Sequence, residues 1–150
     1  MTENVTQPTD QQAESFLEAI EHVRRKEQAQ ILLPLFKQWT GMEPIIWANG
    51  LAGKPGNGII GFGHYHYKYK SGRQGDWFLT GFSPRKQNMA IYIMPGFKGQ
   101  EQTLGRLGPH KHSVSCLYLT NLAKNDLNVL GELVRDSLTI MKERYSWSKN

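Results

Sequence analysis

The chain has 150 residues, about the length of one domain, and 39% of them are hydrophobic, which excludes an intrinsically disordered chain. No apolar run approaches the roughly 20 residues of a membrane-spanning helix, so we expect no membrane segment. The net charge is +5, and it is concentrated in positions 54–111, which carry nine basic and two acidic residues, a net +7. Such an asymmetry bears on binding partners rather than on fold.

The predicted location rests on two features. The N-terminus lacks the basic start and apolar stretch of a secretory signal. Cys116 is the only cysteine, so no internal disulfide can form, which is typical of a reducing compartment. We therefore expect a cytoplasmic protein.

The first predicted helix follows a short polar segment. Residues 1–8 are expected to form a flexible tail. Thr9 and Gln12 then have the spacing of a capping box, which marks a helix start. Apolar residues recur at helical spacing as far as Val23, and the basic run 24–26 suits the negative end of a helix.

A second apolar stripe covers residues 31–39 and predicts a second helix. Pro34 lies within this stripe. Because proline has no backbone N–H, either the helix begins just before it or the helix kinks there. Gly41 is the predicted stop, since glycine readily adopts the left-handed conformation that ends helices.

From about residue 44 the pattern changes to strands. A short apolar run at 45–47 is followed by a loop, predicted from composition, at 51–58. Three strand-like runs with short polar separators come next and predict an antiparallel meander. These runs are 59–70, 76–83 and 88–94.

The remaining predicted elements are a short helix over 100–107, a strand over 113–119 and a long helix over 125–145. The full order is α-α-β-β-β-β-α-β-α. Segregated helices and strands are typical of an α+β domain, with a mainly antiparallel sheet and helices packed on one face. We expect residues 9–150 to form this single domain.

Two segments of the chain resemble the YdhG-like family, a domain of unknown function. They are residues 61–96 (GFGHYHYKYKSGRQGDWFLTGFSPRKQNMAIYIMPG) and residues 109–119 (PHKHSVSCLYL). The resemblance covers about residues 13–145 and implies an α+β domain with helices on one side of a sheet. It implies no reaction, because the family has no agreed catalytic residues, although some members are linked to a frataxin-like role in handling iron. The chain departs from the family at LAGKPGNG (51–58), which looks like an insertion.

Basic and aromatic residues gather around the predicted hairpin turns. Successive strand residues point to opposite faces, so Tyr65, Tyr67 and Tyr69 share one face. An exposed aromatic face beside cations suits a binding surface, whereas the alternative is that these rings are ordinary core packing. The predicted ligand-binding residues are Tyr65, Tyr67, Tyr69, Arg73, Trp77, Arg85 and Lys86.

The preferred function is non-catalytic binding of a small anionic ligand or partner. Arg73, Arg85 and Lys86 can clamp a carboxylate or phosphate beside the rings. Nucleic acid is the alternative at the same residues, since cations neutralise phosphate and rings stack on bases, but a net +7 is modest for that class. No nucleophile or acid–base pair is forced together, so the sequence indicates no catalytic residue and leaves an enzyme undecided.

Metal binding is the competing class of function. His64 and His66 form one H-x-H pair, and His110 and His112 form a second. On a strand, two such imidazoles point the same way and can share zinc, nickel or iron. Lysines flank the pairs and no carboxylate is expected beside them, so the alternative is that all four are surface histidines.

An acidic helix face is the candidate for a frataxin-like handling of iron. Glu14, Glu18 and Glu21 are spaced to lie on one side of the first predicted helix, with Asp10 near the same line. Carboxylate oxygens suit weak iron binding. The alternative is the solvated side of an amphipathic helix.

Overall fold

The computed structural model describes residues 6–48 and 58–149 and confirms the α+β class. The predicted loop at 51–58 lies outside these ranges, except for Gly58. The helices are α1 (Ala13–Glu18), α2 (Val23–Thr40), α3 (Glu101–Leu107) and α4 (Leu127–Arg144), with a 3₁₀ turn η1 (Leu122–Lys124). The strands are β1 (Gln7–Pro8), β2 (Pro44–Ala48), β3 (Gly58–Phe62), β4 (His64–Lys68), β5 (Gln74–Trp77), β6 (Thr80–Pro84), β7 (Met89–Tyr92), β8 (Lys111–His112), β9 (Cys116–Leu119) and β10 (Trp147–Ser148).

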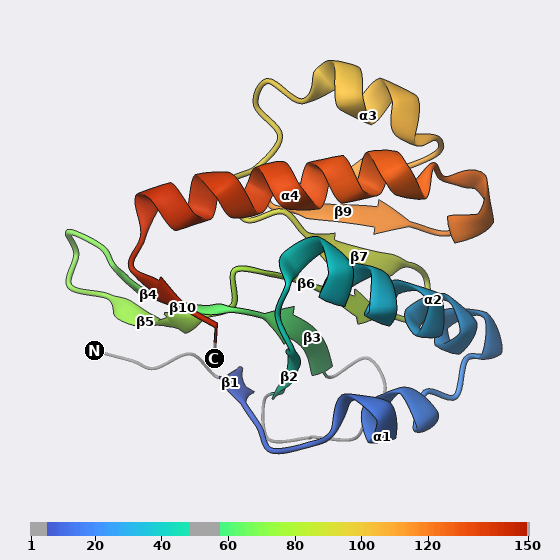
Figure 1. The fold of residues 1–150 in the computed structure, drawn as a ribbon, viewed down its shortest axis with the longest axis horizontal. Helices are drawn as coiled ribbons and strands as arrows, with labels where there is room; N and C mark the ends of the chain where they lie inside the picture. The colour runs from blue at the N-terminus through green and yellow to red at the C-terminus, as the bar shows by residue number, and fades with distance from the viewer. Residues whose placement is uncertain (1–5, 49–57, 150) are drawn as a thin grey trace.

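The strands form two antiparallel sheets. The larger sheet has the order β1-β2-β3-β6-β7-β9-β8, and the smaller one has the order β10-β4-β5. In Figure 1, α2 and α4 lie across one side of the larger sheet and α3 lies on α4. The smaller sheet, made of β4, β5 and β10, projects beyond one end of the larger sheet. The predicted arrangement, with helices on one face of a mainly antiparallel sheet, is confirmed.

The main core lies between the larger sheet and the helices. Phe36 of α2 is fully buried, and its ring lies 4.8 to 5.5 Å from the rings of Trp39, Phe62 and Phe82. The apolar side of α4 is buried in the same core at Leu130, Val134, Leu138 and Met141. Burial of these apolar side chains is the main force that holds the helices on the sheet.

The boundary between the first two helices differs from the prediction. α1 ends at Glu18 and α2 begins at Val23, so residues 23–26 open the second helix instead of closing the first. His22 is the N-cap of α2, and its Nδ1 accepts a hydrogen bond from the Arg25 N–H at 3.3 Å. Histidine is not one of the strong capping residues, so the pattern contained no start signal at this position.

The predicted capping box does not form. Gln12 is the N-cap of α1 but makes no capping hydrogen bond with its side chain. Thr9 instead bridges to β2, since its Oγ1 donates a hydrogen bond to the Ile46 carbonyl at 2.7 Å. Gln7 and Pro8, expected in the flexible tail, pair with the end of β2 as strand β1.

α2 continues through its proline. Pro34 lies inside the helix, so the alternative in which the helix starts at this residue is wrong. Gly41 ends the helix as predicted: its φ is +69° and its N–H donates to the Lys37 carbonyl at 2.8 Å. A left-handed residue at this position is a common helix terminator.

Two of the three predicted central strands are interrupted where the two sheets meet. The run 59–70 is divided at Gly63, whose φ is +78°, into β3 and β4. The run 76–83 is divided into β5 and β6. The alternation of side chains shifts between these strands, because a slip of one residue exchanges the two faces. Phe82 therefore points into the main core, whereas Phe78, four residues earlier, belongs to a second cluster.

The opposite face of the larger sheet carries a second, smaller cluster. Trp47, Phe78, Ala90 and Tyr92 are buried in it. Burial raises the pKa of the Tyr92 hydroxyl, and Arg85 counteracts this by donating a hydrogen bond from Nη2 at 2.7 Å. This face therefore holds aromatic rings and a hydroxyl, and the rings are packed rather than exposed.

Candidate anion-binding hairpin

The β4–β5 hairpin carries the exposed part of the predicted site. At its turn, the Tyr69 N–H donates to the Arg73 carbonyl at 2.8 Å, and the Gly72 N–H donates to the Tyr69 carbonyl at 2.9 Å. Gly72 has a φ of +94°, which glycine adopts without strain. Positions 64–75 contain no Asp or Glu. We define the hairpin tip as four residues with exposed side chains: Lys68, Tyr69, Lys70 and Arg73.

A strand that the sequence did not predict holds this hairpin in place. β10 pairs with β4, with Trp147 opposite Tyr65. Tyr145, just before β10, packs its ring 4.6 Å from that of Tyr65. Lys142 Nζ, from the last turn of α4, lies 4.4 Å from the centre of the Trp147 ring, within the range of a cation–π interaction. The end of α4 and the segment after it thus place a cation and an exposed ring beside the smaller sheet.

Tyr65 and Tyr67 of β4 and Tyr69 just after it do not form an open aromatic face. Tyr65 is only 7% exposed and belongs to the main core, and burial raises the pKa of its hydroxyl well above the usual range. Tyr67 is partly buried against the same core, whereas Tyr69 is 57% exposed. Trp77 is partly buried between the two clusters. The expected exposure of Tyr65 is therefore wrong, and the core-packing alternative holds for it.

The cations of the β6–β7 turn lie away from the hairpin tip. This turn is beside the start of β3, because Ser83 Oγ donates a hydrogen bond to the Gly58 carbonyl at 2.8 Å. The hairpin tip instead follows the end of β4, and β3 and β4 together span about 30 Å when extended. Figure 1 shows the two turns at opposite ends of the strands. The structure therefore does not bring Arg85 and Lys86 to Arg73, and the predicted clamp is not formed.

One face of the hairpin holds a polar cluster that includes two predicted metal ligands. Asp76 Oδ1 lies 3.2 Å from His64 Nε2 and 3.0 Å from His66 Nδ1, and Gln74 Oε1 lies 3.0 Å from His66 Nε2. Two oxygen acceptors around one imidazole favour its protonated form. Hydrogen bonds with Asp76 and then Gln74 raise the pKa of His66, and the bond with His66 lowers the pKa of Asp76. The carboxylate that was not expected beside these histidines comes from the neighbouring strand.

We expect Asp76→Asn to lower the pKa of His66 toward its ordinary value of 6.5, because the charged acceptor is lost. An NMR titration of the imidazole protons measures this change. Gln74→Ala is the control and should lower the pKa by less, since the amide is the weaker of the two acceptors. An unchanged His66 pKa in Asp76→Asn would contradict the assigned hydrogen bond.

The hydrogen-bonded pair of His66 and Asp76 is expected to stabilise the fold within a limited range of pH. A raised His66 pKa contributes stability that is complete below 6.5 and is lost as the pH rises through the pKa of the folded state. A lowered Asp76 pKa contributes stability that is complete above 3.8 and is lost as the pH falls through its folded pKa. The contribution is therefore greatest between these two ordinary values.

The second histidine pair lies on the other sheet. His112 lies in the edge strand β8 and His110 just before it, and their rings are stacked 6.2 Å apart. Their Nδ1 atoms lie 2.9 and 3.0 Å from backbone carbonyl oxygens, and His112 also packs on Phe97 at 4.5 Å. The structure therefore places the two predicted histidine pairs on different sheets.

The predicted acidic helix face is not continuous. α1 ends at Glu18, so Glu21 lies beyond it, and Glu18 itself forms an ion pair with Lys26 at 3.2 Å. Within residues 6–48 and 58–149, no group of three or more His, Cys, Asp or Glu side chains is placed to hold a metal ion, the hairpin cluster included.

Comparisons with models of protein families, with curated proteins and with solved structures find no match for this chain. No helix in the described part of the chain combines the length and the apolar character needed to cross a membrane. Of the predicted ligand-binding residues, those of the hairpin tip are exposed and close together. A function for this tip is therefore inferred from the charges and the ring that it exposes.

Proposed function

We propose that this protein is a non-catalytic binding domain that holds an anionic partner on the β4–β5 hairpin. The supporting observation is the hairpin tip, where the side chains of the cations Lys68, Lys70 and Arg73 and the ring of Tyr69 are all exposed. Among the described residues, none of these three cations lies within ion-pair distance of a carboxylate. Exposed cations without internal partners create a positive potential that attracts anions.

The partner is an extended anion rather than a small one. A small ligand would need convergent cations, and Arg85 and Lys86 lie away from the tip. An extended chain can instead contact the tip cations in succession and continue toward Lys142 beside Trp147, which is 37% exposed. Single-stranded nucleic acid would use both features, because phosphates meet cations while bases stack on exposed rings.

The test uses a single-stranded oligonucleotide and fluorescence anisotropy at several salt concentrations. The triple variant Lys68→Gln, Lys70→Gln and Arg73→Gln should bind at least about tenfold more weakly at low salt, and the slope of log K against log salt should fall by about 2. Tyr69→Ala should weaken binding by about fivefold or more without changing that slope, because it removes stacking only.

A matched control removes the same charge from elsewhere. The variant Lys98→Gln, Lys111→Gln and Lys124→Gln replaces three exposed cations outside the smaller sheet and should retain affinity within about threefold, since distant charges are screened by salt. If the unmodified protein does not bind at low salt, or if both triple variants lose affinity equally, the proposed function is overturned.

We also propose that the protein is a member of the YdhG-like family and that it is located in the cytoplasm. The family membership rests on the resemblance of residues 61–96 and 109–119. The free thiol of Cys116 supports a reducing compartment.

A further inference from the structure

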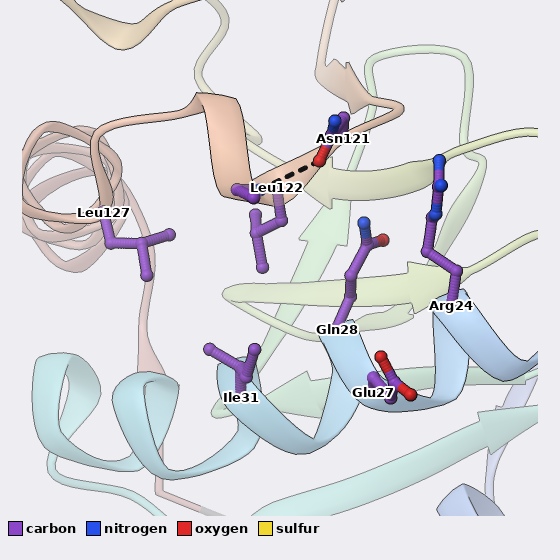
Figure 2. Close-up of a pocket in the computed structure, with 8 residues that line it drawn as sticks. Arg24, Glu27, Gln28, Ile31, Asn121, Leu122 and Leu127 are labelled. Atoms are coloured by element: carbon purple, nitrogen blue, oxygen red, sulfur yellow. Dashed lines mark hydrogen bonds between the residues drawn. The ribbon is translucent and has the colours of Figure 1, made fainter.

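A groove of about 290 Å³ lies between α2 and the segment that leads from η1 into α4. One wall is a single side of α2, made by residues at the helical spacing i, i+3, i+4 and i+7. The other wall is formed by η1 and the first residue of α4, as Figure 2 shows. This volume is at the lower end for small-molecule sites, so it suits a ligand of few atoms.

One end of the groove is apolar. Ile31 projects from α2 and is 48% exposed, which is unusual for a large aliphatic side chain in the middle of a packed helix. Leu122 and Leu127 lie across from it in Figure 2. An aliphatic group placed between these three side chains would be removed from water, which favours its binding.

The other end of the groove is polar and rests on a buried cation. Gln28 is only 6% exposed, and its Oε1 accepts a hydrogen bond from Arg25 Nη1 at 3.0 Å. This orients the Gln28 amide, which projects into the groove in Figure 2 with its N–H donors available. Arg25 is 4% exposed, and no carboxylate among the described residues pairs with it. A buried charge without a counterion favours an anion at this end.

Two exposed charges of opposite sign complete the lining. Arg24 and Glu27 are three residues apart on α2, a spacing at which such side chains often pair. They do not pair with each other, and neither has an ion-pair partner among residues 6–48 and 58–149. The groove therefore presents a cation, an anion and an apolar patch side by side.

From this lining we infer that the groove binds an apolar α-amino acid. A zwitterion with an aliphatic side chain is the small ligand that uses all three features. Its carboxylate meets Arg24 and the Gln28 amide, and its ammonium group meets Glu27. Its side chain lies on Ile31, Leu122 and Leu127. This site is on α2 and α4, so it is separate from the hairpin and independent of the function proposed for it.

The first test is an NMR titration of the full chain with L-leucine up to about 10 mM, which detects a Kd of about 1 mM. We expect amide shifts confined to residues 24–31 and 121–127. N-acetyl-L-leucine and L-leucine amide each lack one charge, and glycine lacks the aliphatic side chain. Each of these three compounds should therefore bind at least about threefold to fivefold more weakly than L-leucine. No shift, shifts at other residues, or equal binding of N-acetyl-L-leucine would overturn the inference.

The second test uses variants at the exposed charges, which leave the core intact. Arg24→Gln and Glu27→Gln should each weaken L-leucine binding by about threefold to fivefold. Arg106→Gln, the same change at an exposed position on α3, is the control and should bind as the unmodified protein does. Unchanged affinity in both Arg24→Gln and Glu27→Gln would also overturn the inference.

Discussion

Phe36→Ala is expected to lower the free energy of unfolding by about 3–5 kcal/mol. Phe36 is fully buried, and its ring contacts Trp39 of the same helix and joins α2 to the sheet through Phe62 and Phe82. Alanine would leave a cavity that three rigid rings from two layers cannot close. The free energy of unfolding therefore falls both by the lost transfer energy of the ring and by the cost of the cavity. Chemical denaturation, followed by tryptophan fluorescence, measures the change.

Two further variants of α2 serve as controls for Phe36→Ala. Phe36→Leu keeps most of the apolar volume and should cost about 1–2 kcal/mol. Val23→Ala removes an aliphatic group that is 70% exposed on the same helix and should change stability by about 0.5 kcal/mol or less. If Phe36→Ala cost no more than Val23→Ala, the packing described for α2 would be wrong.

Arg25→Met is expected to lower the free energy of unfolding by about 2–4 kcal/mol, although methionine suits a buried site. Arg25 Nε donates to the Arg85 carbonyl at 3.0 Å and Nη1 donates to the Thr120 carbonyl at 3.1 Å. Burial, and then the charge of Arg24, lower the pKa of Arg25, so the guanidinium is held at this position against a desolvation cost. Methionine would leave both carbonyls without their charged donor.

The neighbouring arginine provides the control for this prediction. Arg24→Met makes the same change at an exposed position and should alter stability by about 0.5 kcal/mol or less. Thermal or chemical denaturation of both variants gives the comparison. Equal stability of Arg25→Met and Arg24→Met would show that water replaces the lost donors, and that Arg25 does not tie α2 to the two loops.

The periodicity of apolar residues was enough to predict the class of fold and most elements. The long α4 and the central strands have clear patterns, because one face of each is buried. The division of a strand at Gly63 was not predictable, since glycine within a strand-like run does not by itself indicate a change of sheet. The start of α2 at Val23 was missed because its cap is a histidine.

Only the part of the candidate site that is formed by residues adjacent in the sequence, the hairpin tip, could be predicted. The cations and the exposed ring of the hairpin tip follow from a polar turn between two strands. The burial of Tyr65 depends on Tyr145, which belongs to a distant segment, and a two-residue strand such as β10 has too short a pattern to detect. The separation of Arg73 from Arg85 depends on strand length and direction, which composition does not contain.

The pairing of Trp147 with Tyr65 joins positions about eighty residues apart in the chain. During synthesis, at about 5–20 residues per second, β4 and β5 therefore wait several seconds before their third strand leaves the ribosome. Over this interval one side of β4 presents unpaired backbone groups, which neighbouring nascent chains can bind. The late arrival of β10 makes this small sheet a point at which co-translational misassembly can begin.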